Sequence, residues 1–174
     1  MLRAIGSRKD LKQQTYYELV ADLLENESVQ ALKQYRHHIK TTRFQHSVNV
    51  SYYNYLICKF FRWDAVSAAR AGLLHDLYFY ETENYDRAET NESHSAHHPH
   101  VALQNAMEQF TVNDVEQDII EKHMWPATRQ MPHYKESYVI VIVDKYCAAL
   151  EYVAPSLRNV FRKVFRRKQA VASA

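Results

Sequence analysis

The alternation of apolar and polar residues predicts a chain made mostly of amphipathic helices. Residues 10–25 place leucine, tyrosine and valine side chains at the spacing of a helix with one buried face. A second helix is expected from Ser28, as its N-cap, to about His38. Residues 41–61 are apolar on nearly every side of a third helix. We therefore expect this third helix to lie at the centre of the fold.

The middle of the chain continues with helices on both sides of one long polar segment. Asp64 is expected to begin a helix rich in alanine and leucine. Residues 79–99 are polar and have no steady period, which predicts a loop or a loop with one short helix. Further helices are expected over residues 100–110 and 113–123.

The last third of the chain is predicted to contain two more helices. A loop over residues 125–134 precedes residues 137–153, whose β-branched run could form a strand. The length of this segment and its alanine-rich continuation favour a buried helix. A basic amphipathic helix is expected over about residues 155–170. The pattern has no internal repeat and predicts an all-α, single-domain helical bundle spanning residues 1–174.

Composition supports a helical globular protein. Of 174 residues, 47% are hydrophobic, and only 2 are Gly and 4 are Pro, whereas sheets and hairpins need frequent turn residues. The net charge of +2 does not by itself indicate a nucleic-acid partner. Cys58 and Cys147 lie in apolar surroundings and are expected to be buried free thiols. No apolar run reaches membrane-spanning length, and the N-terminus has no signal-peptide pattern, so a cytoplasmic location is expected.

Ionisable residues inside apolar helices are the clearest chemical signal. His75 and Asp76 close the apolar run AGLLHDLYFY, and burying a charge is costly unless it is paired or bound to a metal. Similar positions recur at intervals of 29, 25, 23 and 21 residues, and the full candidate set is His46, His75, Asp76, His100, His123 and Asp144. Each interval fits one helix and one connection, so each ligand would come from a different helix of the bundle.

This set predicts a metal centre. Four imidazoles and two carboxylates exceed what one ion normally takes and suit two ions, with Asp76 placed to bridge them. We expect one or two divalent transition-metal ions, with Fe or Mn favoured and Zn, Co or Ni also compatible with these ligands. Three other histidines lie in polar contexts and are expected at the surface: His37, His38 and His133.

Five segments carry a resemblance to a known family: RFQHSVNV, AGLLHD, HPHVALQNA, IIEKHMW and IVDKY. In this order they resemble the two-metal branch of the HD-domain superfamily of metal-dependent phosphohydrolases. They are similar in particular to the bacterial hydrolases of symmetrical dinucleoside tetraphosphates. The resemblance covers about residues 40–150. It implies an HD-type bundle in which a metal-bound hydroxide hydrolyses a phosphate ester or anhydride of a nucleotide or another small phosphorylated molecule.

Residues beside the ligands are candidates for handling that substrate. Arg43 and Lys145 would bind phosphate, and Lys145 could also neutralise a leaving phosphate. His97 and His98 could act as a general acid or contact phosphate. Together with Asp76, the residues Lys145, His97 and His98 are the candidate catalytic groups.

Two alternative functions remain open from the sequence. Some HD-superfamily members use the same ligand pattern to hold two irons and activate dioxygen, so an oxygenase is one alternative. A non-catalytic, metal-stabilised module that binds a nucleotide or a partner protein is the other. The basic C-terminal helix could contact nucleic acid or a membrane surface, but packing on the domain with solvated charges is the more usual role of such a helix. The sequence carries no signal for an oligomeric state.

Overall fold

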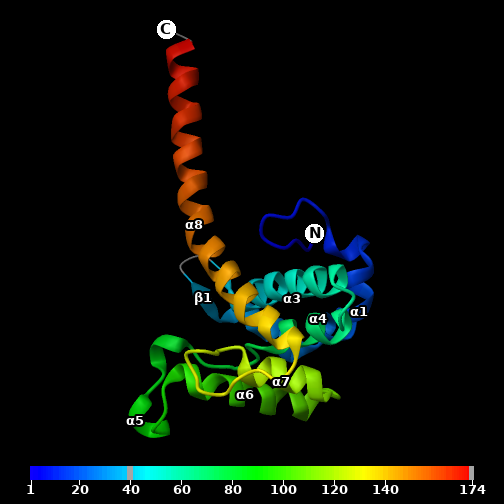
Figure 1. The fold of residues 1–174 in the computed structure, drawn as a ribbon. Helices are drawn as coiled ribbons and strands as arrows, with labels where there is room; N and C mark the ends of the chain where they lie inside the picture. The colour runs from blue at the N-terminus through cyan, green and yellow to red at the C-terminus, as the bar shows by residue number, and fades with distance from the viewer. Residues whose placement is uncertain (39–40, 173–174) are drawn as a thin grey trace.

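The structure is a computed structural model that describes the backbone of residues 1–38 and 41–172, and the side chains of residues 1–37 and 41–153. The predicted all-α class is confirmed, apart from one small two-stranded ribbon (Figure 1). The α-helices are α1 (Thr15–Glu25), α2 (Glu27–Ala31), α3 (Arg43–Phe60), α4 (Ala65–Leu74), α5 (Arg87–Thr90), α6 (His94–Gln109), α7 (Asp114–Lys122) and α8 (Lys135–Ala172). Short 3-10 turns occur at Leu11–Gln13, Leu32–Gln34 and Thr82–Asn84.

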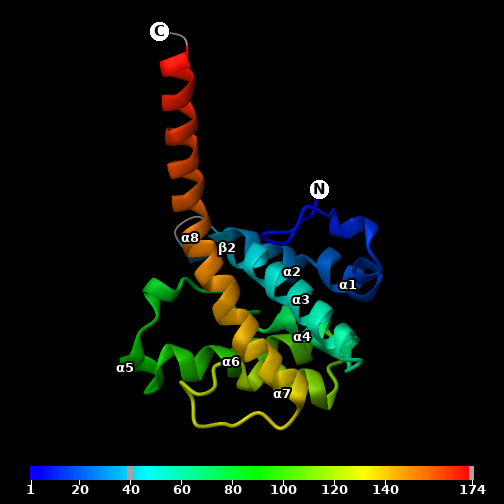
Figure 2. The ribbon, with the colours of Figure 1, turned by 45° about the horizontal axis from the view of Figure 1, so that its top comes forward.

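Helix α3 lies at the centre of the bundle, as its apolar character predicts. It packs against α4 and α8, and Figure 2 shows α8 running beside it. The Thr42 side chain caps its N-terminus by accepting a hydrogen bond from the Gln45 amide. Gly72 of α4 approaches the backbone of α3 so closely that an added Cβ would lie 2.8 Å from the Cα of Ser51.

The second predicted helix is shorter than expected. Asn26, not Ser28, caps α2, and the helix ends at Ala31. The chain then enters strand β1 (Arg36–His38), which pairs antiparallel with β2 (Thr41–Thr42). The physical reason is that residues 33–38 contain only one apolar side chain, so a continued helix would have had no face to bury.

Helix α6 begins earlier than predicted. Ser93 accepts a hydrogen bond from the Ala96 amide and caps a helix that starts at His94 rather than at His100. Pro99 lies inside this helix, although a proline inside a helix is usually disfavoured. The polar segment before α6 contains the short helix α5, so the prediction of a loop with one short helix is confirmed. The loop ends at Ser93 rather than at Pro99, because α6 starts at His94.

Helices α7 and α8 begin at or within two residues of their predicted starts. Asn113 and Glu116 form a reciprocal capping box at the start of α7. The β-branched segment is helical, within α8. The expected separate helix over 155–170 is instead the continuation of α8, and its side chains lie outside the described residues.

Both Cys58 and Cys147 are buried and free, as predicted. Within residues 1–38 and 41–172, no helix combines the length and the apolar character that a membrane span requires.

We expect Gly72→Ala to destabilise the protein by about 1–3 kcal/mol, because the new methyl group would overlap the α3 backbone. Urea unfolding measures this change. Val66→Ala, on the exposed face of the same helix, is the matched control and should change stability by less than about 0.5 kcal/mol. Equal stability of Gly72→Ala and the wild type would contradict the close helix approach.

Candidate metal centre

Five of the six predicted ligands meet at one buried place. The structure brings together three groups, and within each group the ligand atoms lie within 4.8 Å of one another: His37, His46 and Asp76; His46, His75 and Asp144; and His75, Asp76 and His123. Each pair of groups shares one residue, so the three are contiguous. Buried His and Asp side chains from separate elements therefore form a cluster that could hold a metal ion.

The histidines are oriented by the helix ends on which they lie. His75 follows the last residue of α4, and its Nδ1–H donates to the carbonyl of Gly72 at 2.9 Å. His123 stands in the same place after α7 and donates to the carbonyl of Ile120 at 2.7 Å. Each ring thus satisfies a carbonyl that the helix terminus leaves free. Its Nε2 lone pair is left directed at the cluster, as in many metal sites.

The cluster contains nitrogen atoms whose placement is unfavourable without a cation. His75 Nε2 is buried and has no hydrogen-bond partner among the described residues. His98 Nε2 lies 2.9 Å from His123 Nε2, while the Nδ1 atoms of both rings are engaged by backbone carbonyls. Two neighbouring nitrogens bound to one ion at about 2.1 Å each would lie at a similar separation, roughly 3 Å. The arrangement therefore fits a metal site.

Burial and neighbouring imidazoles set the protonation states of His123 and Asp76. Burial, with His98 and His75 nearby, lowers the pKa of His123 to about 3. Its ring is therefore neutral and able to bind a metal at neutral pH. Burial alone would raise the pKa of Asp76, but the surrounding histidines, His75 first, hold it well below its ordinary value. Asp76 is therefore a carboxylate.

His46 is held between two carboxylates. Its Nε2 lies 3.0 Å from Asp144 Oδ1 and its Nδ1 lies 3.1 Å from Glu151 Oε1. Burial would lower the pKa of His46, but these hydrogen bonds outweigh it and raise the pKa to about 10. In the metal-free chain the protonated ring thus supplies the positive charge, and metal binding must release its proton.

Glu151 contacts this centre, although it was not among the residues expected there. It is buried in α8 and also accepts a hydrogen bond of 2.7 Å from Asn49 Nδ2. A carboxylate on the outer nitrogen of a ligand histidine fixes the orientation of the ring and increases its basicity. Glu151 lies seven positions after Asp144, two helical turns along the same face of α8, so its spacing could have identified it.

The expected ligand His100 does not reach the cluster, and His98 lies there instead. The His100 side chain is 45% exposed, with Nδ1 3.7 Å from Glu121 Oε1. His98 is buried and its Nε2 lies 3.5 Å from Asp76 Oδ1. Because α6 begins at His94, its residues 98 and 100 point about 200° apart around the helix. Only one of them can face the bundle.

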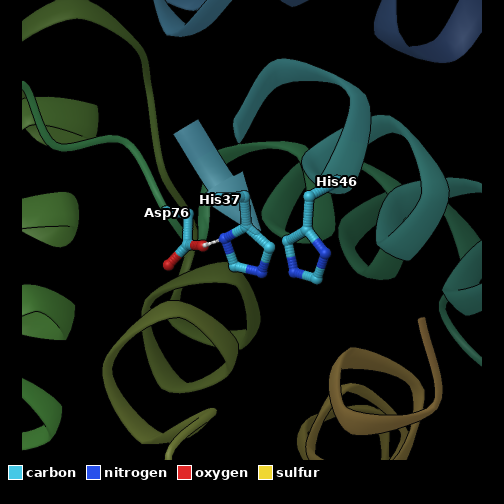
Figure 3. Close-up of side chains that lie close together, drawn as sticks. All are labelled: His37, His46 and Asp76. Carbon is cyan, nitrogen blue, oxygen red and sulfur yellow. Dashed lines mark ion pairs between the residues drawn. The ribbon is translucent and has the colours of Figure 1, made fainter. Parts of the chain in front are cut away.

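His37 also lies at the cluster, although it was expected at the surface. Its ring stacks on His46 with centroids 3.6 Å apart, and its Nδ1 lies 3.6 Å from Asp76 Oδ2 (Figure 3). It comes from strand β1, whose polar sequence gave no sign of burial. His133 is exposed, as predicted, and the side chain of His38 lies outside the described residues.

Arg43, which was expected to bind phosphate, lies buried against the backbone. It is fully buried, and its guanidinium donates to the carbonyls of Tyr78 at 2.7 Å and Tyr80 at 3.0 Å. The same group lies 3.6 Å from the centre of the Tyr78 ring. Arg43 therefore anchors the segment that follows Asp76.

Of the expected substrate-handling residues, Lys145 lies at the edge of the centre and His97 lies away from it. Lys145 is 49% exposed, and its Nζ lies 3.9 Å from Asp144 Oδ2. His97 is 29% exposed, and its Nδ1 lies 3.5 Å from Glu92 Oε2. Lys145 is thus accessible from solvent beside a candidate ligand, whereas His97 faces the loop that precedes α6.

The contrast between His98 and His100 can be tested by substitution. We expect His98→Ala to weaken binding of Mn²⁺ or Zn²⁺ by at least about tenfold, because it removes a group at the centre. His100→Ala, as the matched control, should leave the affinity within about twofold. Calorimetric titration measures both. The reverse order would mean that α6 presents its other face to the metal.

The stability of the metal-free chain should depend on pH on both sides of about 6.5. The pKa of His123 is about 3 in the folded chain, against 6.5 in the unfolded chain. Between pH 6.5 and 3 the imidazole is therefore protonated only when the chain is unfolded. The free energy of unfolding falls as the pH is lowered through this window. His46, at about 10, binds its proton more tightly in the folded chain, so its contribution is lost as the pH rises from 6.5 to 10.

Urea unfolding in the presence of a chelator measures this profile. His123→Asn should make the acidic limb shallower, because His94 and His98, whose pKa values burial also lowers, still contribute to it. His133→Ala, which changes an exposed histidine, is the control and should leave the limb as it is. An acidic limb that persists fully in His123→Asn would refute the contribution of this residue.

Comparison with protein-family models, with curated proteins and with solved structures finds no match to this chain. What bears on function is therefore the centre itself: buried imidazoles and carboxylates, several oriented by helix ends, that could hold a metal ion.

Proposed function

We propose that the chain is a metal-dependent phosphohydrolase of the two-metal HD-domain type. It would cleave a phosphate ester or anhydride of a nucleotide or another small phosphorylated molecule. The observation that carries the proposal is the convergence of buried His Nε2 atoms on Asp76 and Asp144 from separate helices.

The ligand set supports two ions better than one. Asp76 has one carboxylate oxygen 3.5 Å from His98 Nε2 and the other 3.6 Å from His75 Nε2. Its two oxygens thus face different imidazoles, which is what a bridging carboxylate requires. Asp144 and Glu151 add negative charge on the His46 side. Two divalent cations would outweigh the three carboxylates of Asp76, Asp144 and Glu151, so that before hydroxide binds the centre is positive and attractive to a phosphate.

The cations would supply the chemistry and the chain would position the substrate. When bound, divalent ions polarise a phosphoryl oxygen and lower the pKa of water, so that a nucleophile is available near neutral pH. Lys145 is exposed beside Asp144 and could pair with a non-transferred or departing phosphate. Arg43 would act indirectly, by fixing the backbone after Asp76.

The proposal predicts that metal and activity are lost together in Asp76→Ala. The wild type, loaded with Mn²⁺ or Fe²⁺, should release phosphate from mono- or dinucleotides, and elemental analysis should find metal. Asp114→Ala removes an exposed carboxylate of α7 and should keep both.

Three outcomes would reject the proposal. Full activity of metal-free Asp76→Ala would exclude metal catalysis. Metal binding without turnover across a broad phosphate panel would indicate a non-catalytic module. Consumption of dioxygen with an organic substrate would indicate the oxygenase reaction.

Lys145→Ala should raise KM by about tenfold with little change in kcat, because a charged hydrogen bond to phosphate is lost. Steady-state kinetics measure the effect, and Lys9→Ala, an exposed lysine of the N-terminal segment, is the control. An unchanged KM would remove Lys145 from the substrate site.

A further inference from the structure

The turn between α3 and α4 presents large apolar side chains to solvent. Its sequence is KFFRW, residues 59–63, and Phe60 and Phe61 are 80% and 53% exposed. The two phenyl rings meet edge to face at 5.1 Å, and Phe61 stacks on Trp63 at 5.0 Å. Arg62 has a φ of 57°, in the left-handed region that a tight turn requires.

The apolar surface continues onto the neighbouring helix. Ile142 of α8 is 70% exposed and borders a groove of about 380 Å³. The groove lies between Ile57, Phe61 and Trp63 on one side and Val139, Ile142 and Val143 on the other. We call Phe60, Phe61, Trp63 and Ile142 the turn patch. Single exposed apolar residues are ordinary, but a contiguous patch of this kind marks an interaction surface.

The turn patch is separate from the metal centre. Phe60 lies 14 positions after His46 on the same helix, a distance of about 21 Å along its axis. None of the residues of the patch belongs to the described metal cluster. Its role is therefore independent of the proposed hydrolysis.

The charges around the patch are mostly positive. Lys59 and Arg62 flank the two phenylalanines and are exposed, and Lys135 Nζ lies 5.2 Å from the centre of the Trp63 ring. The nearby carboxylate of Asp64 is engaged in capping α4, where it accepts hydrogen bonds from the amide and the hydroxyl of Ser67. Glu136 is buried and accepts from the Asp64 amide.

This distribution favours an anionic partner over a second copy of the chain. A two-fold contact through the patch would bring the same cations of both copies together, at a cost in electrostatic energy. An anionic lipid surface instead offers phosphates for the cations and an apolar layer for the rings. Phenylalanine at the acyl boundary, tryptophan at the headgroups and flanking lysine or arginine is the combination that such a surface binds.

We propose that the turn patch binds the surface of an anionic lipid bilayer. Phe60, Phe61 and Ile142 would enter the boundary between headgroups and acyl chains, with Trp63 at headgroup level. Lys59, Arg62 and Lys135 would pair with lipid phosphates. The chain would lie on the bilayer through this end of α3 and the start of α8.

The test is co-sedimentation of the full chain with vesicles of phosphatidylcholine, alone or mixed with phosphatidylglycerol. The wild type should bind the mixed vesicles, less tightly as salt is raised, and bind pure phosphatidylcholine weakly. Phe60→Ser with Phe61→Ser should weaken binding at least tenfold. Met107→Ser, which changes an exposed apolar residue of α6, is the matched control and should bind as the wild type does.

A second double variant tests the contribution of the cations beside the turn patch. Lys59→Glu with Arg62→Glu should lower the affinity for the mixed vesicles at least tenfold. Its far-ultraviolet circular dichroism and its metal content should stay those of the wild type, which shows that the variant is folded and that only the lipid-binding surface has changed. Retained vesicle binding in both double variants would overturn the proposal and point to another segment, such as the basic C-terminal part of α8.

Self-association through the turn patch must be distinguished from lipid binding. Light scattering across a range of protein concentrations measures it without lipid. A dimer that Phe60→Ser with Phe61→Ser abolishes, together with no vesicle binding by the wild type, would show that the patch joins two copies and would overturn the proposal. Vesicle binding is measured without turnover, so its result does not depend on whether the chain is a phosphohydrolase.

Discussion

The arrangement of the whole centre depends on how its histidines are tied to the backbone. His75 and His123 each end a helix and each donate Nδ1–H to the carbonyl three residues earlier, while His98 donates to the carbonyl of His94. One hydrogen bond thus caps a helix and fixes a tautomer. The consequence is a set of Nε2 lone pairs directed at one another, which is stable only with protons or cations between them. The C-terminal ends of α4 and α7 add a favourable dipole for a cation.

The rest of the fold holds these helix ends in register. Helix α3 supplies His46 from its first turn and, through Arg43, anchors the backbone that follows Asp76. Helix α8 supplies Asp144 and Glu151, which enclose His46 from two sides. Because these contacts join residues about 100 positions apart, the centre exists only when the bundle is assembled.

The two long helices also link the centre to the turn patch. On α8, Asp144 and Glu151 face the cluster while Ile142 faces solvent, and on α3 His46 and Phe60 lie near opposite ends. If both proposals hold, a rigid pair of helices keeps the metal centre at a fixed height above a lipid surface.

The sequence by itself determined the helical class, the starts of α4 and α7 and five of the residues that meet at the centre. These follow from local rules: apolar periodicity, capping side chains at Asp64 and Asn113, and the cost of burying an ionisable group without a partner. Only the tertiary structure decided which face of α6 turns inward, so that His98 replaces His100. It also decided that His37 joins the cluster and that Arg43 is buried against the backbone. These outcomes depend on the rotation of one helix and on contacts between segments far apart in the chain, and no local pattern of residues encodes either.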